Sequence, residues 1–102
     1  MASLRRGYLV IKHSVSSKGA NHRFVFTSED GRYFCWKSLD SEDEKRIELI
    51  SISRIVREGV EFFLKASYVK NISHCLVIMS EDKKLQLELG SEMETEYLRY
   101  EL

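Results

Sequence analysis

Cationic side chains surround one polar loop near the start of this sequence. The set comprises Lys12, His13, Lys18, His22 and Arg23. Lys and Arg hold phosphate groups through charge-assisted hydrogen bonds, and Arg can make two of them in parallel. This spacing therefore predicts a surface that favours an anionic partner at the end of a β-hairpin.

The charge of the whole chain is polarised in the same sense. The 102 residues have no net charge, but residues 1–37 hold seven Lys and Arg against two acids, a net charge of +5. Residues 38–102 carry the compensating −5. Such polarity orients a protein towards an anionic partner even when the total charge vanishes. The acidic remainder argues against nucleic-acid binding, which needs a broad basic face.

Side chains suited to catalysis are present, but no motif organises them. The sequence has no nucleophile elbow, no phosphate loop and no paired metal-ligand motif. His74 and Cys75 are adjacent, and adjacent strand residues point to opposite faces of a sheet. We therefore expect no enzyme activity, no metal and no cofactor.

The two cysteines, Cys35 and Cys75, both lie inside apolar runs and lack metal-ligand spacing. This pattern favours two buried free thiols in a reducing compartment. A single disulfide is the alternative, and it would suggest secretion.

Trp36 and its aromatic neighbours Tyr33 and Phe34 are predicted to be packing residues.

Strands must position most of these side chains, because short apolar runs alternate with turn signals along the chain. A helix is expected at the end, where Ser91 and Glu94 have the spacing of a capping box. The segment 58–70 is ambiguous between a short strand and a packed loop. The predicted strands are 7–13, 22–28, 32–37, 45–50, 52–57, 72–79 and 83–89, followed by a helix over 91–102.

Two of these segments have a clear periodicity. The strand 83–89 alternates strictly, which predicts three leucines facing inward at Leu85, Leu87 and Leu89. Lys84, Gln86 and Glu88 are then expected to face outward. In the helix, Met93, Tyr97 and Tyr100 fall on one face and form its predicted apolar stripe.

The plan of seven strands and one C-terminal helix resembles the pleckstrin-homology (PH) domain, closest to the phospholipase C-type branch. Local sequences agree with this resemblance. The matching stretches are Gly7-Tyr8-Leu9, Arg23-Phe24, Trp36, Ile52–Gly59, His74–Met79 and Leu85–Leu89. The resemblance implies one PH domain over residues 1–102: mainly β, a seven-stranded antiparallel, partly open barrel or sandwich capped by the helix. It assigns Tyr97, or alternatively Leu98, to packing against the open end of the sheet.

The resemblance also implies a site and a function. It places a lipid headgroup at the first hairpin, with Lys12, His13, Lys18, His22 and Arg23 as ligands. Lys37 widens this patch, and Val15 inserts beneath the headgroups. Protonation of the two histidines below their ordinary pKa of ~6.5 would strengthen anion binding.

We thus expect a non-catalytic membrane-targeting module that binds phosphatidic acid or a phosphoinositide. It would be a monomer, cytoplasmic and peripherally associated with membranes. The alternative is a PH-like protein-interaction module without a lipid ligand. In that case the acidic loop 40–44 or the acidic helix would dock a basic partner.

Overall fold

The structure is a computed structural model, and it describes residues 4–13, 20–60, 69–81 and 83–102. Seven strands, two short 3-10 helices and one α-helix make up the described chain. They are β1 (Tyr8–His13), β2 (Ala20–Thr27), β3 (Tyr33–Ser38), β4 (Glu44–Glu48), η1 (Leu49–Ser51), β5 (Ile52–Val56), η3 (Ile72–His74), β6 (Cys75–Ser80), β7 (Lys84–Glu88) and α1 (Glu92–Glu101).

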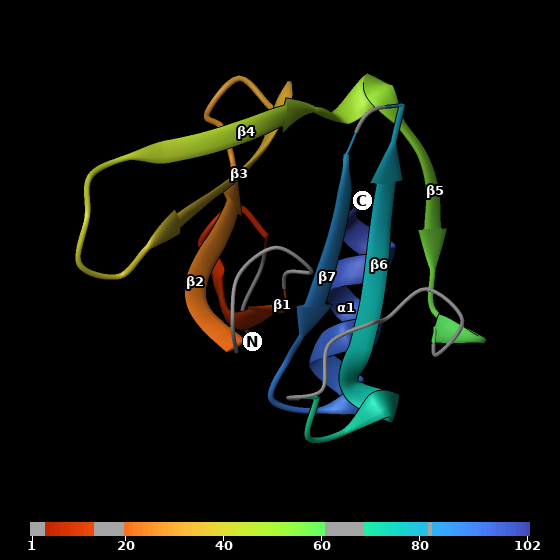
Figure 1. Cartoon of the computed structure of the whole chain (residues 1–102). Coiled ribbons are helices and arrows are strands. Elements are labelled where there is room, and N and C mark those ends of the chain that lie inside the picture. The colour runs from red at the N-terminus through yellow and green to blue at the C-terminus, as the bar shows by residue number, and fades with distance from the viewer. Residues whose placement is uncertain (1–3, 14–19, 61–68, 82) are drawn as a thin grey trace.

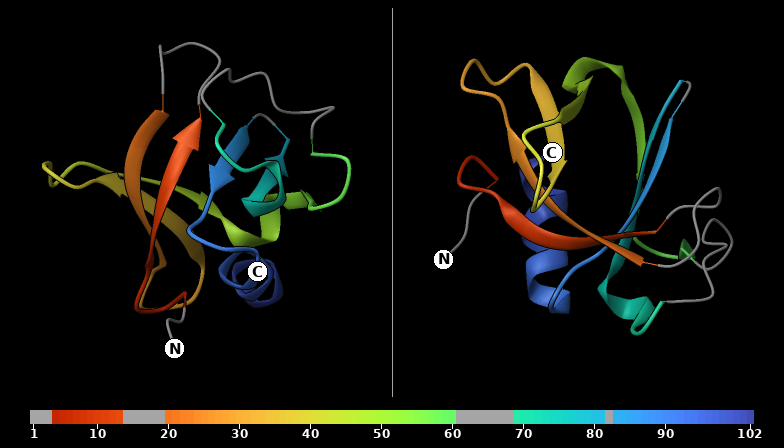
Figure 2. Two further views of the ribbon diagram at one scale, coloured as in Figure 1. Left: turned by 90° about the horizontal axis from the view of Figure 1, so that it is seen from below. Right: turned by 60° about the vertical axis from the view of Figure 1, so that its left-hand side comes forward.

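All strands belong to one antiparallel sheet in the order β4-β3-β2-β1-β7-β6-β5. Since β4 and β5 are the two edges and do not pair with each other, the sheet is not closed. Figure 1 shows β2–β4 on one side of the molecule and β5–β7 on the other, with α1 behind β6 and β7. Figure 2 shows α1 end-on, beside the strands. The predicted fold class is confirmed: mainly β, seven antiparallel strands and a C-terminal helix.

The strand ends differ from prediction mainly before β6. Residues Ile72–His74 form the turn η3 where the sequence predicted the start of a strand. The His74 amide donates to the Asn71 carbonyl at 3.0 Å, which closes this turn. The apolar run therefore enters the sheet only at Cys75.

The core lies on the concave face of the sheet, where both halves contribute. Antiparallel partners share a face, so Tyr8 and Val25, which are paired, point the same way. The predicted inward leucines of β7 and its following residue are confirmed. The buried members of this core are Leu4, Tyr8, Val10, Val25, Phe34, Trp36, Ile47, Leu76, Ile78, Leu85, Leu87, Leu89 and Leu98.

The other face of β7 is also buried, which corrects the prediction for Gln86 and Glu88. They do point away from the leucines, but each residue is only 2% exposed. A second cluster, with Cys75 and Val77 of β6 and Val60 beyond β5, packs on this side of the sheet. Val60 and Val69, which flank residues 61–68 in the connection between β5 and β6, therefore help to cover a face that strand alternation alone assigns to solvent.

The helix begins as predicted. The Ser91 hydroxyl accepts the Glu94 amide at 3.1 Å, and the Glu94 carboxylate accepts the Gly90 amide at 3.2 Å. The first bond satisfies an amide that the helix itself leaves unpaired, and the second joins the residue before the N-cap to the first turn.

The predicted apolar stripe of α1 is wrong for two of its three residues. Met93 is 66% exposed and Tyr100 is 85% exposed, whereas Leu98 is fully buried. Thr95 fixes this orientation of the helix, because its buried hydroxyl donates to the His74 carbonyl of η3 at 2.8 Å and also lies 2.8 Å from the Ser91 carbonyl. Leu98, the alternative residue at the open end of the sheet, is the one that enters the core, while Tyr97 packs at its margin.

The C-terminal end of α1 is hydrogen-bonded to the first described residues of the chain. The Glu101 carboxylate accepts the Leu4 amide and, at 3.2 Å, the Tyr8 hydroxyl. Burial and the neighbouring Glu101 carboxylate raise the pKa of Tyr8 to about 12. The first described residues are thereby tied to the last helix.

Both cysteines are free and buried, as the first of the two alternatives predicted. Burial raises the pKa of the thiol to about 11 at Cys35 and about 12 at Cys75. In the described part of the chain, no helix is long and apolar enough to span a membrane.

Gly7 provides a test of the packing at the start of β1. Its φ is +103°, and a Cβ added there would lie 2.2 Å from Cζ of Phe24. We expect Gly7→Ala to lower the free energy of unfolding by about 3 kcal/mol, since backbone strain and overpacking add. Urea denaturation measures this.

Gly31 is the matched control for Gly7. Its φ is +72°, but no atom lies within 4 Å of an added Cβ. Gly31→Ala should therefore cost only the backbone strain, about 1 kcal/mol. An equal loss of unfolding free energy in the two variants would show that the Phe24 ring moves aside without an energetic cost, and would contradict the predicted overpacking.

Candidate functional site

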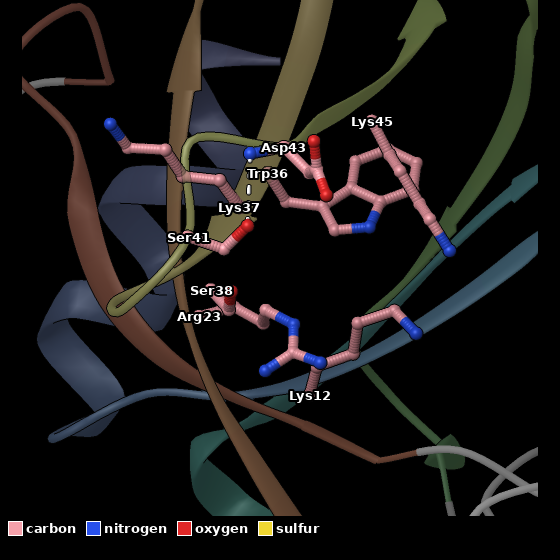
Figure 3. A pocket seen from close by; sticks show the side chains of 8 residues that line it. All are labelled: Lys12, Arg23, Trp36, Lys37, Ser38, Ser41, Asp43 and Lys45. Carbon is pink, nitrogen blue, oxygen red and sulfur yellow. Dashed lines mark hydrogen bonds between the residues drawn. The ribbon is translucent and has the colours of Figure 1, made fainter.

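A pocket of about 200 Å³ opens where β1, β2, β3 and β4 meet at one end of the concave face (Figure 3). Each of the four strands contributes at least one lining residue, and the loop between β3 and β4 contributes two. The lining residues are Lys12, Arg23, Trp36, Lys37, Ser38, Ser41, Asp43 and Lys45.

The strand register explains why three cations share this pocket. Arg23 is paired with Val10 on β1, so Arg23 points to the same face as Lys12, two residues beyond Val10. Lys45 is paired with Trp36, which belongs to the core on the concave face, so Lys45 points to this face as well. We call Lys12, Arg23 and Lys45, together with the space between them, the cationic pocket.

The charges in the cationic pocket act on one another. Partial burial, and then the positive charges of Arg23 and Lys45, lower the pKa of Lys12. One carboxylate, that of Asp43, lies on the pocket wall. Three cations against one acid leave the pocket positive, and an anion bound there would relieve the repulsion among the cations.

Trp36 forms a wall of the cationic pocket and is the only tryptophan of the chain. The Lys83 ammonium lies 5.7 Å from the centre of its ring, a cation–π contact. The sequence predicted a packing role for Trp36, and the residue does belong to the core. Its position also makes it a fluorescent reporter of pocket occupancy.

The lowered pKa of Lys12 predicts that this lysine reduces the stability of the fold. A lysine whose pKa is lower in the folded state disfavours folding at pH values below that pKa. This penalty disappears as the pH rises towards the unfolded value of ~10.4. We expect Lys12→Met to raise the free energy of unfolding at pH 7 by on the order of 1 kcal/mol, less at pH 10.

Urea denaturation at the two pH values measures this change. Lys37→Met is the matched control, because its ammonium points away from the pocket in Figure 3. A Lys12→Met variant that is no more stable than the parent at pH 7 would contradict the predicted repulsion.

Of the six predicted headgroup ligands, the structure brings Lys12 and Arg23 together. Lys37 also lines the pocket, but it is paired with Phe24 and Glu44 on the outer face, and its ammonium points away from the pocket (Figure 3). His22 is paired with Ile11 and faces the outer side of the sheet, away from Arg23. Lys18 and the predicted insertion residue Val15 lie outside the described residues.

His13 is removed from the surface altogether. Its side chain is fully buried, and its Nε2 atom lies 2.9 Å from Oε1 of Glu88. The two predicted histidines therefore do not line the cationic pocket, and the expectation of pH-dependent recruitment loses its structural basis.

Glu88 is the centre of a buried polar junction. Besides His13, it accepts the backbone amides of Asn71 at 2.9 Å and Lys70 at 3.2 Å. Burial alone would raise the pKa of the Glu88 carboxyl, but the hydrogen bonds from Asn71, His13 and Lys70 outweigh it and lower this pKa. The junction joins β1, β7 and the segment that leads into β6.

Lys45 is the site residue that the sequence prediction missed. A signal was present, because Lys45 is two residues before the inward-facing Ile47 and so shares its face. The sequence could not show that Lys45 of β4 lies near Lys12 of β1, because only the folded sheet brings these two residues to one pocket.

Among the described residues, no group of three His, Cys, Asp or Glu could hold a metal ion.

Comparison with known proteins supports the fold. No protein-family model matches the chain, and no curated protein matches it significantly. PLC21 of L. pealei has a similar structure, with a TM-score of 0.77 and 14% sequence identity over 99% of this chain. PLC21 of S. officinalis has a TM-score of 0.75 and 16% identity over 97% of this chain.

The chain spans only 15% of the length of either PLC21 chain. A third similar structure is the C-terminal domain of an unknown protein from Leishmania infantum. It has a TM-score of 0.62 and 14% identity, over 97% of this chain and 83% of that one. Together with the strand order and the C-terminal helix, these similarities show a PH-like fold.

Proposed function

We propose that this PH-like module binds the headgroups of anionic phospholipids in the cationic pocket and thereby brings the protein that carries it to a membrane. The module would act by binding alone, without catalysis. One observation carries the proposal: Lys12, Arg23 and Lys45 come from three different strands and converge on a single open pocket.

The chemistry of the cationic pocket suits a phosphate monoester. Arg23 can donate two parallel hydrogen bonds to phosphate oxygens, and the two lysines supply further donors. Each basic residue near an anionic bilayer contributes roughly 1 kcal/mol. Three such residues support weak to moderate affinity, as a reversible peripheral module requires.

Phosphatidic acid and the phosphoinositides both present phosphate monoesters, so both are candidate ligands. Phosphatidic acid offers one compact monoester that can carry two negative charges. Lys12 and Arg23 favour the second ionisation, because a cation stabilises the dianion. We infer a phosphomonoester headgroup as the shared ligand chemistry, and the vesicle experiment separates the two lipid classes.

Co-sedimentation with matched vesicles tests the proposal. The vesicles carry phosphatidic acid, phosphatidylserine, one phosphoinositide at a time, or neutral lipid only. We expect the protein to pellet with a phosphomonoester lipid and to remain soluble with neutral vesicles. The fluorescence of Trp36 should change most with the lipids that pellet the most protein.

Two variants control this experiment. Arg23→Ala should abolish most of the pelleting, whereas Lys37→Ala removes the same charge outside the pocket and should change it about twofold at most. Pelleting by none of the vesicles would reject the lipid function and favour the protein-interaction alternative.

A further inference from the structure

We propose that Ser41 is a phosphorylation site for a serine kinase that selects acidic substrates, and that the resulting phosphate occupies the cationic pocket. Such a phosphate would compete with the headgroup, and this consequence alone rests on the proposed function. Two independent features meet at this residue: its flanking sequence and its position on the pocket wall.

The flanking sequence is strongly acidic on the C-terminal side. Ser41 is followed by Glu42, Asp43 and Glu44 and preceded by Asp40. Kinases discriminate among substrates by charge patterns of this kind, since a basic peptide groove attracts a run of carboxylates. The run falls in the loop between the end of β3 and the start of β4, and its acidic residues are exposed. A kinase can therefore reach an irregular segment on the surface.

The position of Ser41 relates this loop to the cationic pocket. Ser41 lines the pocket together with Arg23, Lys12 and Lys45 (Figure 3). Its hydroxyl oxygen accepts the Asp43 amide at 3.0 Å, which holds the side chain in a local turn. A phosphate on this oxygen would extend from the wall into a space already bordered by three cations.

The modification is an ordinary phosphoryl transfer from ATP. The Ser41 hydroxyl oxygen attacks the γ-phosphorus, the bond from that phosphorus to the β–γ bridging oxygen breaks, and ADP leaves. The hydroxyl proton passes to the catalytic base of the kinase. The product oxygen can still accept the Asp43 amide, so the loop can keep its local turn.

The added charge decides the consequence. A phosphoserine brings about −1.5 to −2 charges at pH 7 and three strong acceptor oxygens. Asp43 and Glu42 oppose this charge, but the three cations of the pocket outnumber the single acid on its wall. The phosphate then neutralises the cations that the headgroup needs, and we expect anionic-vesicle affinity to fall at least tenfold.

The first experiment measures the intramolecular contact directly and requires no lipid. Phosphoserine is incorporated at position 41 during translation, and its second pKa is followed by phosphorus NMR. We expect this pKa to lie about half a unit or more below that of a free phosphoserine, because cations stabilise the dianion. Adding Arg23→Ala should restore part of the shift.

Phosphoserine at position 53 is the control, because Ser53 is exposed and does not line the pocket. An unshifted second pKa at position 41, or the same pKa at positions 41 and 53, would overturn the proposed contact. That result holds whether or not the protein binds lipid.

A second experiment tests the acceptor and the competition. The purified protein is incubated with ATP and an acidic-directed serine kinase, and the site is mapped by mass spectrometry. Label at Ser41 that disappears in Ser41→Ala is expected; label only at other serines would overturn the assignment. Phosphatidic acid vesicles then compare the modified and unmodified protein. Failure of the unmodified protein to bind would reject the proposed function and leave the NMR result standing.

Discussion

Replacing Glu88 with alanine should lower the free energy of unfolding by about 3–5 kcal/mol. The Glu88 carboxylate is the acceptor for His13 and for the backbone amides of Lys70 and Asn71, and the Glu88 side chain is only 3% exposed. Removing it leaves the buried His13 ring and the two backbone amides without that acceptor. Urea denaturation at neutral pH measures the loss.

The pH dependence provides a second readout of the same junction. The pKa of Glu88 is lowered in the folded protein, so its ionised form stabilises the fold above the ordinary carboxyl range. This contribution is lost as the pH falls through the folded pKa. Glu88→Gln should therefore show a smaller loss of stability on acidification than the parent protein.

Glu48→Ala is the control for both measurements. Glu48 is an exposed residue of β4, so its removal should change the stability by no more than about 0.5 kcal/mol. If Glu88→Ala and Glu48→Ala unfold at the same urea concentration, the buried junction is not a stabilising element.

Reversing the charge at Lys45 should lower the affinity for anionic vesicles about 30-fold. Lys45→Glu changes the pocket by two charges, and each basic residue near an anionic surface is worth roughly 1 kcal/mol. The carboxylate also lies where Lys12 and Arg23 would hold the phosphate. Vesicle co-sedimentation at several lipid concentrations gives the affinity.

The adjacent residue offers a matched control for Lys45. Arg46 points to the outer face of β4, where its guanidinium carbon lies 4.1 Å from the centre of the Tyr33 ring. Arg46→Glu makes the same charge change outside the pocket and should reduce vesicle affinity only slightly. Equal losses in the two variants would indicate general surface attraction and would contradict a defined headgroup site.

The elements of the fold were largely predictable from local sequence. Alternation identified the inward leucines of β7, and the capping box located the start of α1 at Ser91. The helix orientation was not predictable, because Met93 and Tyr100 satisfy the helical period as well as Leu98 does. Thr95 decides between these faces through its hydrogen bond to η3, a contact between segments distant in the sequence.

The candidate site divides in the same way. Sequence alone determined the strands, the polarity of charge and the cationic hairpin that contains Lys12 and Arg23, since these depend on residue type and short spacing. Tertiary structure decided which cations meet. It added Lys45 through the pairing of β4 with β3, and it buried His13 against Glu88. Strand pairing and the cover over the outer face act between distant residues, so no local pattern records them.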